Sequence, residues 1–166
     1  MKIVRLFFLA AILVVPLSAS PQTSGVILSG ADLTRVVPTS FYFQGLSAPT
    51  QMRNAAAVRF GDNHYVIAGM VDTSGYAADV RAKYEGFLIT DTPITVNGKD
   101  LGIGAYGFGF TNDAKLNVLD LSGKEVFSVA TNKDSELKRP RPLMMNSSGG
   151  TVRLYAGKDY VTIAAK

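Results

Sequence analysis

The chain of 166 residues contains no cysteine, no tryptophan and a single histidine, which excludes disulfides, thiolate metal ligands and a thiol nucleophile. Its 17 lysines and arginines against 13 acidic residues give a net charge of +4, and two of these cations, Lys2 and Arg5, lie in an N-terminal segment that we expect to be removed. The remaining excess of about +2 is far below the dense positive field of a dedicated nucleic-acid-binding protein. We therefore expect no nucleic-acid partner.

Residues 1–20 have the three parts of a bacterial secretory signal peptide: two basic residues, an apolar run over residues 6–17, and small residues at 18–20. The apolar run is well short of the roughly 20 residues that a helix needs to cross a bilayer. We therefore expect cleavage near residue 20, a periplasmic or extracellular location and no stable membrane insertion. Residues 21–166 are then expected to form a single all-β domain.

Short apolar segments separated by turn residues follow, which is the pattern of an antiparallel all-β domain. In chain order we expect strands at residues 25–29, 39–44, 58–60, 65–71, 83–90, 93–96, 105–110, 115–119, 125–129, 151–155 and 160–163. Turns at 61–63, 97–98, 122–123 and 157–159 are expected to connect pairs of these strands. Short helices are expected at 31–37, 77–82 and 133–138. Two stretches, 45–54 and 139–150, are expected to be long loops, where binding residues often lie.

One expected strand alternates glycine with aromatic residues. Period-2 geometry places Tyr106, Phe108 and Phe110 on one face of this strand and Gly107 and Gly109 on the other. Glycine permits a sharp bend or the close approach of another element. We therefore expect an antiparallel meander that forms a small barrel, with a β-sandwich as the alternative and with two or three short helices.

Three glycines match a nucleotide-binding motif by spacing alone. Gly102, Gly104 and Gly107 have the spacing of the dinucleotide fingerprint. That chemistry needs a helix N-terminus directly after the glycines, so that free backbone amides point at the phosphates, and here a strand is expected instead. We expect no nucleotide and no other cofactor.

Catalytic patterns are weak in this sequence. Asp72 begins an Asp-Thr-Ser-Gly run, but the extra Ser74 breaks the aspartic-protease pattern and no second copy occurs; a hydrogen-bonded turn is the favoured interpretation. His64 follows an expected turn, and no nucleophile-elbow motif accompanies it. We predict no catalytic residue, and an enzyme whose carboxylates come from distant strands stays an alternative.

Metal-binding patterns are equally sparse. Asp113, Asp120, Asp134 and Glu136 lie in or near expected turns and could offer oxygen ligands to calcium, but no Asp-x-Asp loop is present. A single histidine without cysteine leaves no zinc-ligand spacing. We predict no metal site and assign these carboxylates to capping and solubility.

Arg139 and Arg141 lie in the densest positive charge after the signal peptide, and the prolines around them hold the backbone extended. They are candidate contacts for phosphates or acidic sugars, with a solvated loop that protects a sheet edge as the alternative. Met144 and Met145 follow directly, and such methionines can pack into the mouth of a barrel or contact a ligand.

Two neighbouring stretches carry a family resemblance. Residues 94–101 read ITVNGKDL and residues 104–110 read GAYGFGF. This pattern of a Gly-Lys turn, a leucine and then Gly-x-Tyr resembles a family of small exported bacterial β-proteins of unknown function. The resemblance extends over residues 58–155, including VDTSGY at 71–76 and LKRPRP at 137–142. It implies a β fold and an envelope location, and it implies no catalytic residues.

Together these patterns predict an exported bacterial envelope protein with a noncatalytic domain that binds a small apolar ligand or another envelope protein. Its candidate ligand-binding residues are Tyr106, Phe108, Phe110, Arg139 and Arg141. The aromatic residues are expected to pack in the core as well, which is the commoner role of such a row. The alternatives are a structural envelope protein, a small outer-membrane barrel and a carboxylate-dependent hydrolase.

Overall fold

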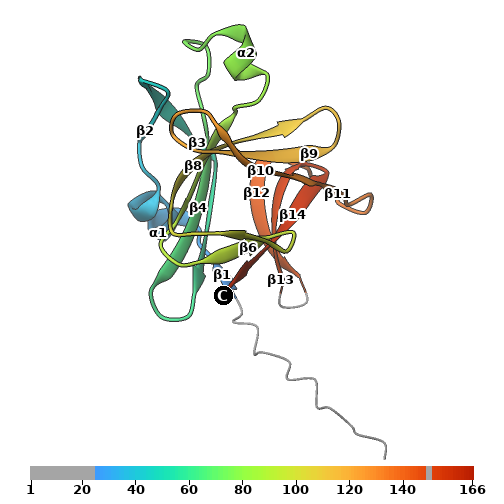
Figure 1. Ribbon diagram of the computed structural model, residues 1–166. Coiled ribbons are helices and arrows are strands. Elements are labelled where there is room, and N and C mark those ends of the chain that lie inside the picture. Colours follow the sequence, from blue (N-terminus) through green and yellow to red (C-terminus); the bar gives the residue numbers. More distant parts are fainter. Residues whose placement is uncertain (1–24, 149–150) are drawn as a thin grey trace, which may run out of the picture.

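The computed structural model describes residues 25–148 and 151–166, so the expected signal peptide lies outside the described residues. Within them the chain forms two β-sheets and two short helices (Figure 1). This is the all-β architecture expected from the spacing of apolar segments and turns. Neither of the helices in this described part is long and apolar enough to cross a membrane.

The first sheet contains eight strands, and neighbouring strands within it are antiparallel. They are β1 (Gly25–Ile27), β2 (Ser40–Phe43), β3 (Leu46–Phe60), β4 (His64–Val71), β5 (Gly86–Thr90), β8 (Gly104–Thr111), β9 (Lys115–Leu119) and β10 (Glu125–Ala130). The order in the sheet is β1-β3-β4-β5-β8-β9-β10, with β2 paired to β3. The expected hairpins β3–β4 and β9–β10 are confirmed by their registers.

The second sheet contains six strands. They are β6 (Ile94–Val96), β7 (Lys99–Leu101), β11 (Asn132–Lys133), β12 (Arg141–Ser148), β13 (Thr151–Gly157) and β14 (Asp159–Ala165). Their order is β12-β13-β14-β6-β7, with β11 paired to β14. The β6–β7 turn has positive φ at both Asn97 (45°) and Gly98 (79°), as a type I′ hairpin requires. Because the chain leaves the first sheet for β6 and β7 and returns at β8, the strands do not form one continuous meander.

The main core lies between the two sheets. Alternate residues of β3, which are Ala56, Val58 and Phe60, point into it, and Leu154 and Ile163 meet them from the second sheet. Each sheet keeps its own edge strands, and in the part of the chain that the structure describes the sheets do not close into a barrel. The expected barrel is therefore not supported, and the layers are two sheets packed face to face.

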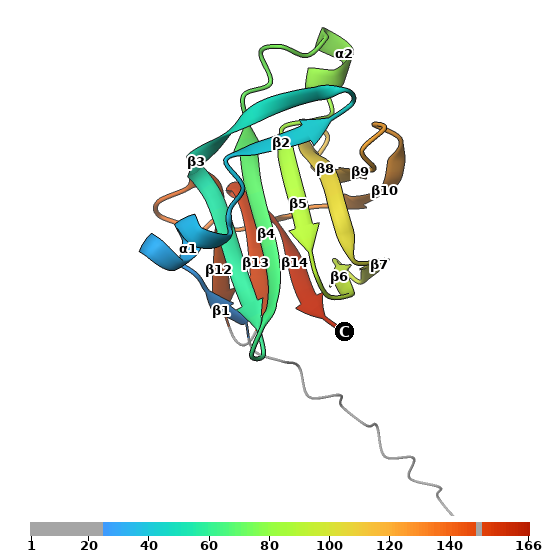
Figure 2. The same ribbon diagram turned by 90° about the vertical axis from the view of Figure 1, so that its left-hand side faces the viewer.

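A second apolar cluster covers the outer face of the first sheet. Helix α1 (Gly30–Val36) and the β2–β3 hairpin lie over this face (Figure 2). Phe43 of β2 is fully buried there, and its ring stacks on that of Tyr84 with 3.9 Å between centroids. The first sheet is thus buried from both sides wherever this cover lies.

Both segments expected to be loops contain long strands. Residues 46–54 belong to β3, and residues 141–148 form β12. Each contains a proline and several polar residues, which lower strand propensity. Pro49 pairs with Ser40 of the short strand β2, and Pro142 lies in the irregular register between Arg141 and Met144. At such edges and bulges a missing backbone donor is tolerated.

Two of the three expected helices are present. They are α1 and α2 (Ala78–Arg81). The helix expected at 133–138 is wrong, because Lys133 ends β11 and turns and bends follow it. Asp134 accepts a hydrogen bond from the Tyr155 hydroxyl at 3.0 Å, and its backbone N–H donates to the Lys158 carbonyl at 2.9 Å. These tertiary bonds hold the segment against the second sheet and replace a local helical turn.

The glycines of β8 admit the cover layer. A Cβ atom on Gly107 would lie 2.5 Å from Cε2 of Phe43, and one on Gly109 would overlap the backbone carbonyl of Lys83. Of the two roles that glycine can have in a strand, close approach of another element is the one seen here. The bare face of β8 therefore seats a second layer.

Two buried tyrosines give a matched test of this cover layer. The Tyr76 hydroxyl donates to the Phe43 and Leu46 carbonyls at 3.2 and 3.0 Å, whereas the Tyr84 hydroxyl makes no hydrogen bond of good geometry among the described residues and has only the Tyr76 hydroxyl near it. Burial raises the pKa of Tyr84, so the group stays neutral. We expect Tyr76→Phe to lower the free energy of unfolding by about 1 kcal/mol. Tyr84→Phe should leave it unchanged or raise it, and equal losses in urea unfolding would contradict this assignment.

A second prediction concerns Gly109. Gly109→Ala places a methyl group against fixed backbone, and we expect a loss of about 1–3 kcal/mol in the free energy of unfolding. Gly102→Ala is the matched control, because its Cβ would meet only the Tyr106 hydroxyl at 3.9 Å. That variant should be as stable as the parent chain. Urea unfolding of both variants provides the measurement, and a tolerated Gly109→Ala would show that the cover does not depend on a bare strand.

Candidate functional site

The aromatic residues of β8 point into the core between the sheets. Phe108 is 1% exposed, and Tyr106 and Phe110 are half-buried against the same cluster. The rings of Phe108 and Phe110 meet edge to face with 6.0 Å between centroids. The Tyr106 hydroxyl donates to the Gly102 carbonyl at 3.1 Å. Core packing thus accounts for most of this row.

Phe110 also lines a surface hollow of about 410 Å³. Thr131, Lys133 and Asp159 are among its other lining residues, and the Thr131 hydroxyl is buried without a hydrogen-bond partner among the described residues. Lys133 and Asp159 are directly opposite each other in the β11–β14 pair, so their charges offset. This hollow offers a polar surface without a net charge.

The two candidate arginines are not brought to the aromatic row. Arg139 is exposed just before β12, and Arg141 is exposed at its first position. An Nη atom of Arg141 donates to the Arg53 carbonyl at 3.0 Å, which fixes the side chain beside β3. Arg141 lines a different hollow, of about 230 Å³, together with Met144 and Met145. Of the pair, Arg141 is the residue with a defined place on a concave surface.

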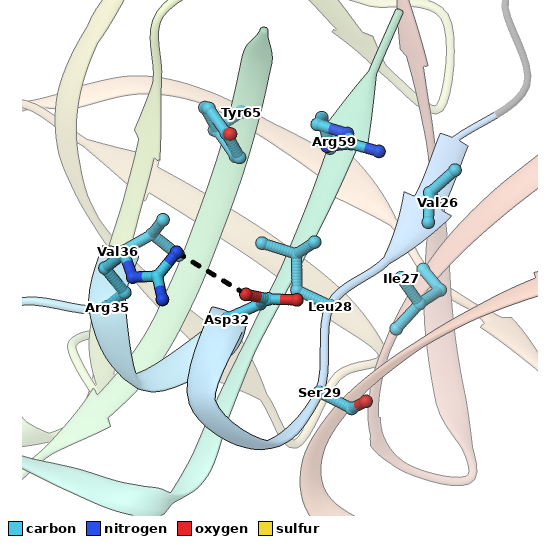
Figure 3. A pocket seen from close by; sticks show the side chains of 9 residues that line it. All are labelled: Val26, Ile27, Leu28, Ser29, Asp32, Arg35, Val36, Arg59 and Tyr65. Atoms are coloured by element: carbon cyan, nitrogen blue, oxygen red, sulfur yellow. Dashed lines mark ion pairs between the residues drawn. The ribbon is translucent and has the colours of Figure 1, made fainter. Parts of the chain in front are cut away.

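A pocket with two arginines lies where the cover over the first sheet ends. We call this hollow of about 270 Å³ the arginine pocket; it is lined by residues 27–29, by Val26, Arg59 and Tyr65 from the sheet, and by Asp32, Arg35 and Val36 from α1 (Figure 3). The strand registers pair Val26 with Arg59 and Arg59 with Tyr65, which puts the three in one row across β1, β3 and β4. One turn of α1 faces this row, because positions 32, 35 and 36 share a helix face.

Arg59 is the unusual group in this pocket. Its residue is half-buried, and its Nε atom is buried without a hydrogen-bond partner among the described residues. Arg35 lies 3.7 Å from the Asp32 carboxylate, and both side chains are more than 70% exposed. Such an exposed pair contributes little and yields easily to a competing anion. With two guanidinium groups and one carboxylate, the arginine pocket carries a net positive charge.

The pocket has one signal in the sequence, which lies in β3. In residues 55–60, alternate positions face opposite sides of the sheet, so Ala55, Ala57 and Arg59 point outward. On this outer face two small apolar residues are followed by an arginine, and a charged residue is rare on a surface that is otherwise buried. That Arg59 lines the same pocket as Arg35 of α1 depends on how the helix packs on the sheet, which local sequence does not show.

The acidic groups singled out in the sequence mostly bond within their own turns. Asp72 accepts the Ser74 N–H at 3.0 Å, which lowers the pKa of Asp72, and Asp120 accepts the Ser122 N–H at 2.9 Å. His64 lies 3.6 Å from the Asp91 carboxylate, with both side chains exposed. In residues 25–148 and 151–166 no three potential ligands gather for a metal ion.

Glu85 is a partly buried carboxylate that the sequence did not indicate. It accepts the Phe110 N–H at 2.9 Å. Burial raises the pKa of Glu85, and the Phe110 hydrogen bond partly offsets this shift. A raised pKa can mark a catalytic acid, but this carboxylate is used to join the segment before β5 to β8. Its geometry is that of a structural group.

The raised pKa of Glu85 gives a pH-dependent prediction. The folded protein holds this proton more tightly than the unfolded chain, so the stabilisation is complete below the ordinary value of 4.5 and is lost as pH rises through the folded pKa. We expect Glu85→Gln to be more stable than the parent chain near neutral pH, with the difference vanishing at about pH 4. Urea unfolding across this range tests it, with exposed Glu125→Gln as the control. A Glu85→Gln variant that is less stable at neutral pH would contradict it.

Comparison of the chain with protein-family models, with curated proteins and with solved structures gives no match. The residues and geometry of the site therefore have to indicate the function, and they indicate a small, positively charged pocket at the edge of a rigid two-sheet scaffold.

Proposed function

We propose that this protein is a noncatalytic binding module, exported from a bacterial cell, that takes a small ligand with an anionic group in the arginine pocket. The observation that carries the proposal is that two guanidinium groups, those of Arg59 and Arg35, line one hollow with a single carboxylate, that of Asp32. The Nε atom of Arg59 is buried and makes no hydrogen bond among the described residues, so an anion has to reach this group through its Nη atoms. An anionic ligand would offset the positive charge of this hollow, which an apolar ligand could not do.

The geometry suits a planar or tetrahedral oxyanion. A guanidinium group presents donors in a fixed fork that matches a carboxylate or a phosphate. Arg59 comes from the sheet and Arg35 from α1, where it pairs with Asp32 (Figure 3). Val26 and Val36 supply apolar walls beside the charged groups, so the ligand's anionic group would be partly shielded from water, where such bonds are stronger.

Titration with acetate and with inorganic phosphate tests this function. We expect amide shifts in ¹H–¹⁵N spectra to concentrate at Leu28 and Tyr65 and to saturate in the parent chain. Arg59→Met should abolish them, because the methionine keeps the apolar stem and removes the donors. The same change should leave the free energy of unfolding equal or higher, since it deletes a buried unpartnered donor.

The controls separate a specific site from general attraction to a basic surface. Arg53→Met removes an exposed arginine from the same strand, and it should leave both titrations intact. Asp32→Asn removes the carboxylate that competes for Arg35. This change should raise the affinity for both acetate and phosphate. The function is wrong if neither anion shifts these amides in the parent chain, or if the two arginine variants lose binding equally.

A further inference from the structure

The arginine pocket has an apolar neighbour. The hollow that contains Arg141, which we call the methionine hollow, is also lined by Leu33, Ala55, Ala56, Met144 and Met145. Both hollows border the same short segment, Ile27, Leu28 and Ser29, and this segment is fixed to β3 by the Leu28 N–H, which donates to the Ala57 carbonyl at 2.9 Å. Ser29 precedes α1 as its N-cap residue, and its side chain makes no capping hydrogen bond. The hydroxyl at the junction is therefore available to a ligand that touches both hollows.

The chemistry of the two hollows is complementary. The arginine pocket carries two guanidinium groups, whereas the apolar residues that line the methionine hollow are one isoleucine, two leucines, two alanines and two methionines. Alanines at 55 and 56 leave room where β3 is irregular between Thr50 and Ala55. Methionine side chains are unbranched and flexible, so they adapt to an apolar group of variable shape. Arg141 is directed to the Arg53 carbonyl, and it forms the polar rim of this hollow.

Size also favours joint use. The hollows measure about 270 and 230 Å³, and each alone is smaller than the roughly 300–1,000 Å³ of typical ligand sites. A ligand that crosses the shared segment would have the volume of both hollows, about 500 Å³, which lies within that range. A ligand that used only one of them would leave most of its surface in water.

We propose that the two hollows form one site for an amphiphile with a single anionic group and a short apolar chain. The anionic group binds Arg59 and Arg35, and the apolar chain of the ligand passes over Leu28 and Ser29 to pack on Leu33 and Met144. This inference rests on the proposed function and adds the class of ligand. It assigns a ligand contact to Met144, whereas Met145 is buried in the core between the sheets.

The length of the ligand's alkyl chain is the variable that tests the joint site. Calorimetric titration with acetate, butanoate, hexanoate and octanoate, each below its micelle concentration, should show affinity that rises by up to about fourfold per added methylene, from about 0.8 kcal/mol per buried CH₂. Leu33→Gln and Met144→Gln should each flatten this rise and leave acetate affinity unchanged, because neither residue lines the arginine pocket. Leu121→Gln, at an exposed leucine of the β9–β10 turn, is the matched control and should keep the full rise.

The outcomes separate this inference from the function on which it rests. Acetate binding with no gain from butanoate to octanoate would overturn the joint site and leave the arginine pocket standing. A gain that survives unchanged in both the Leu33 and Met144 variants would overturn the methionine hollow as the place of the chain. Octyl glucoside that binds as tightly as octanoate would show an apolar site independent of the arginines. Absence of all binding, acetate included, would remove the proposed function itself.

Discussion

The packing of the β2–β3 hairpin on the bare face of β8 is the contact on which the rest of the structure depends. Phe43 lies against Gly107, and its ring stacks on Tyr84. The tip of the hairpin is tied to the β9–β10 turn, since the Gln44 N–H donates to the Leu121 carbonyl at 3.0 Å. A protein without disulfides gains a second apolar cluster in this way, and the first sheet is stabilised from both faces.

This cover also decides where a ligand can reach the first sheet. Helix α1 and β2 occupy part of the outer face (Figure 2), and the row that contains Arg59 lies at the border of the covered part. A guanidinium group at such a border is partly shielded from water, but its donors are not all used by the protein. An anion that binds there makes stronger hydrogen bonds than it would in water. The inner face cannot serve the same purpose, because Phe108 and the facing apolar residues of the second sheet fill it.

Local sequence predicted the hairpins well because a hairpin is specified by its own turn. Asn97 and Gly98 adopt the positive φ values that their turn needs, and the short connections before β4, β10 and β14 separate strands that alternate in polarity. Residues 46–54 and 141–148 were misassigned as loops because their prolines and polar residues lower strand propensity, although β2 and β13, with which they pair, are neighbouring strands in the chain. Pro49 and Pro142 are tolerated only because of where the neighbouring strands pair.

By itself, the sequence determined the class of fold, the two faces of β8 and the absence of disulfides, because period-2 alternation, turn chemistry and composition are properties of short segments. Tertiary structure alone decided whether the glycine face would close a barrel or receive another layer, since both uses require the same bare backbone. It also decided the candidate site. Arg59 and Arg35 come from a strand and a helix that meet only through packing, and Arg141 is separated from the aromatic row with which the sequence had grouped it.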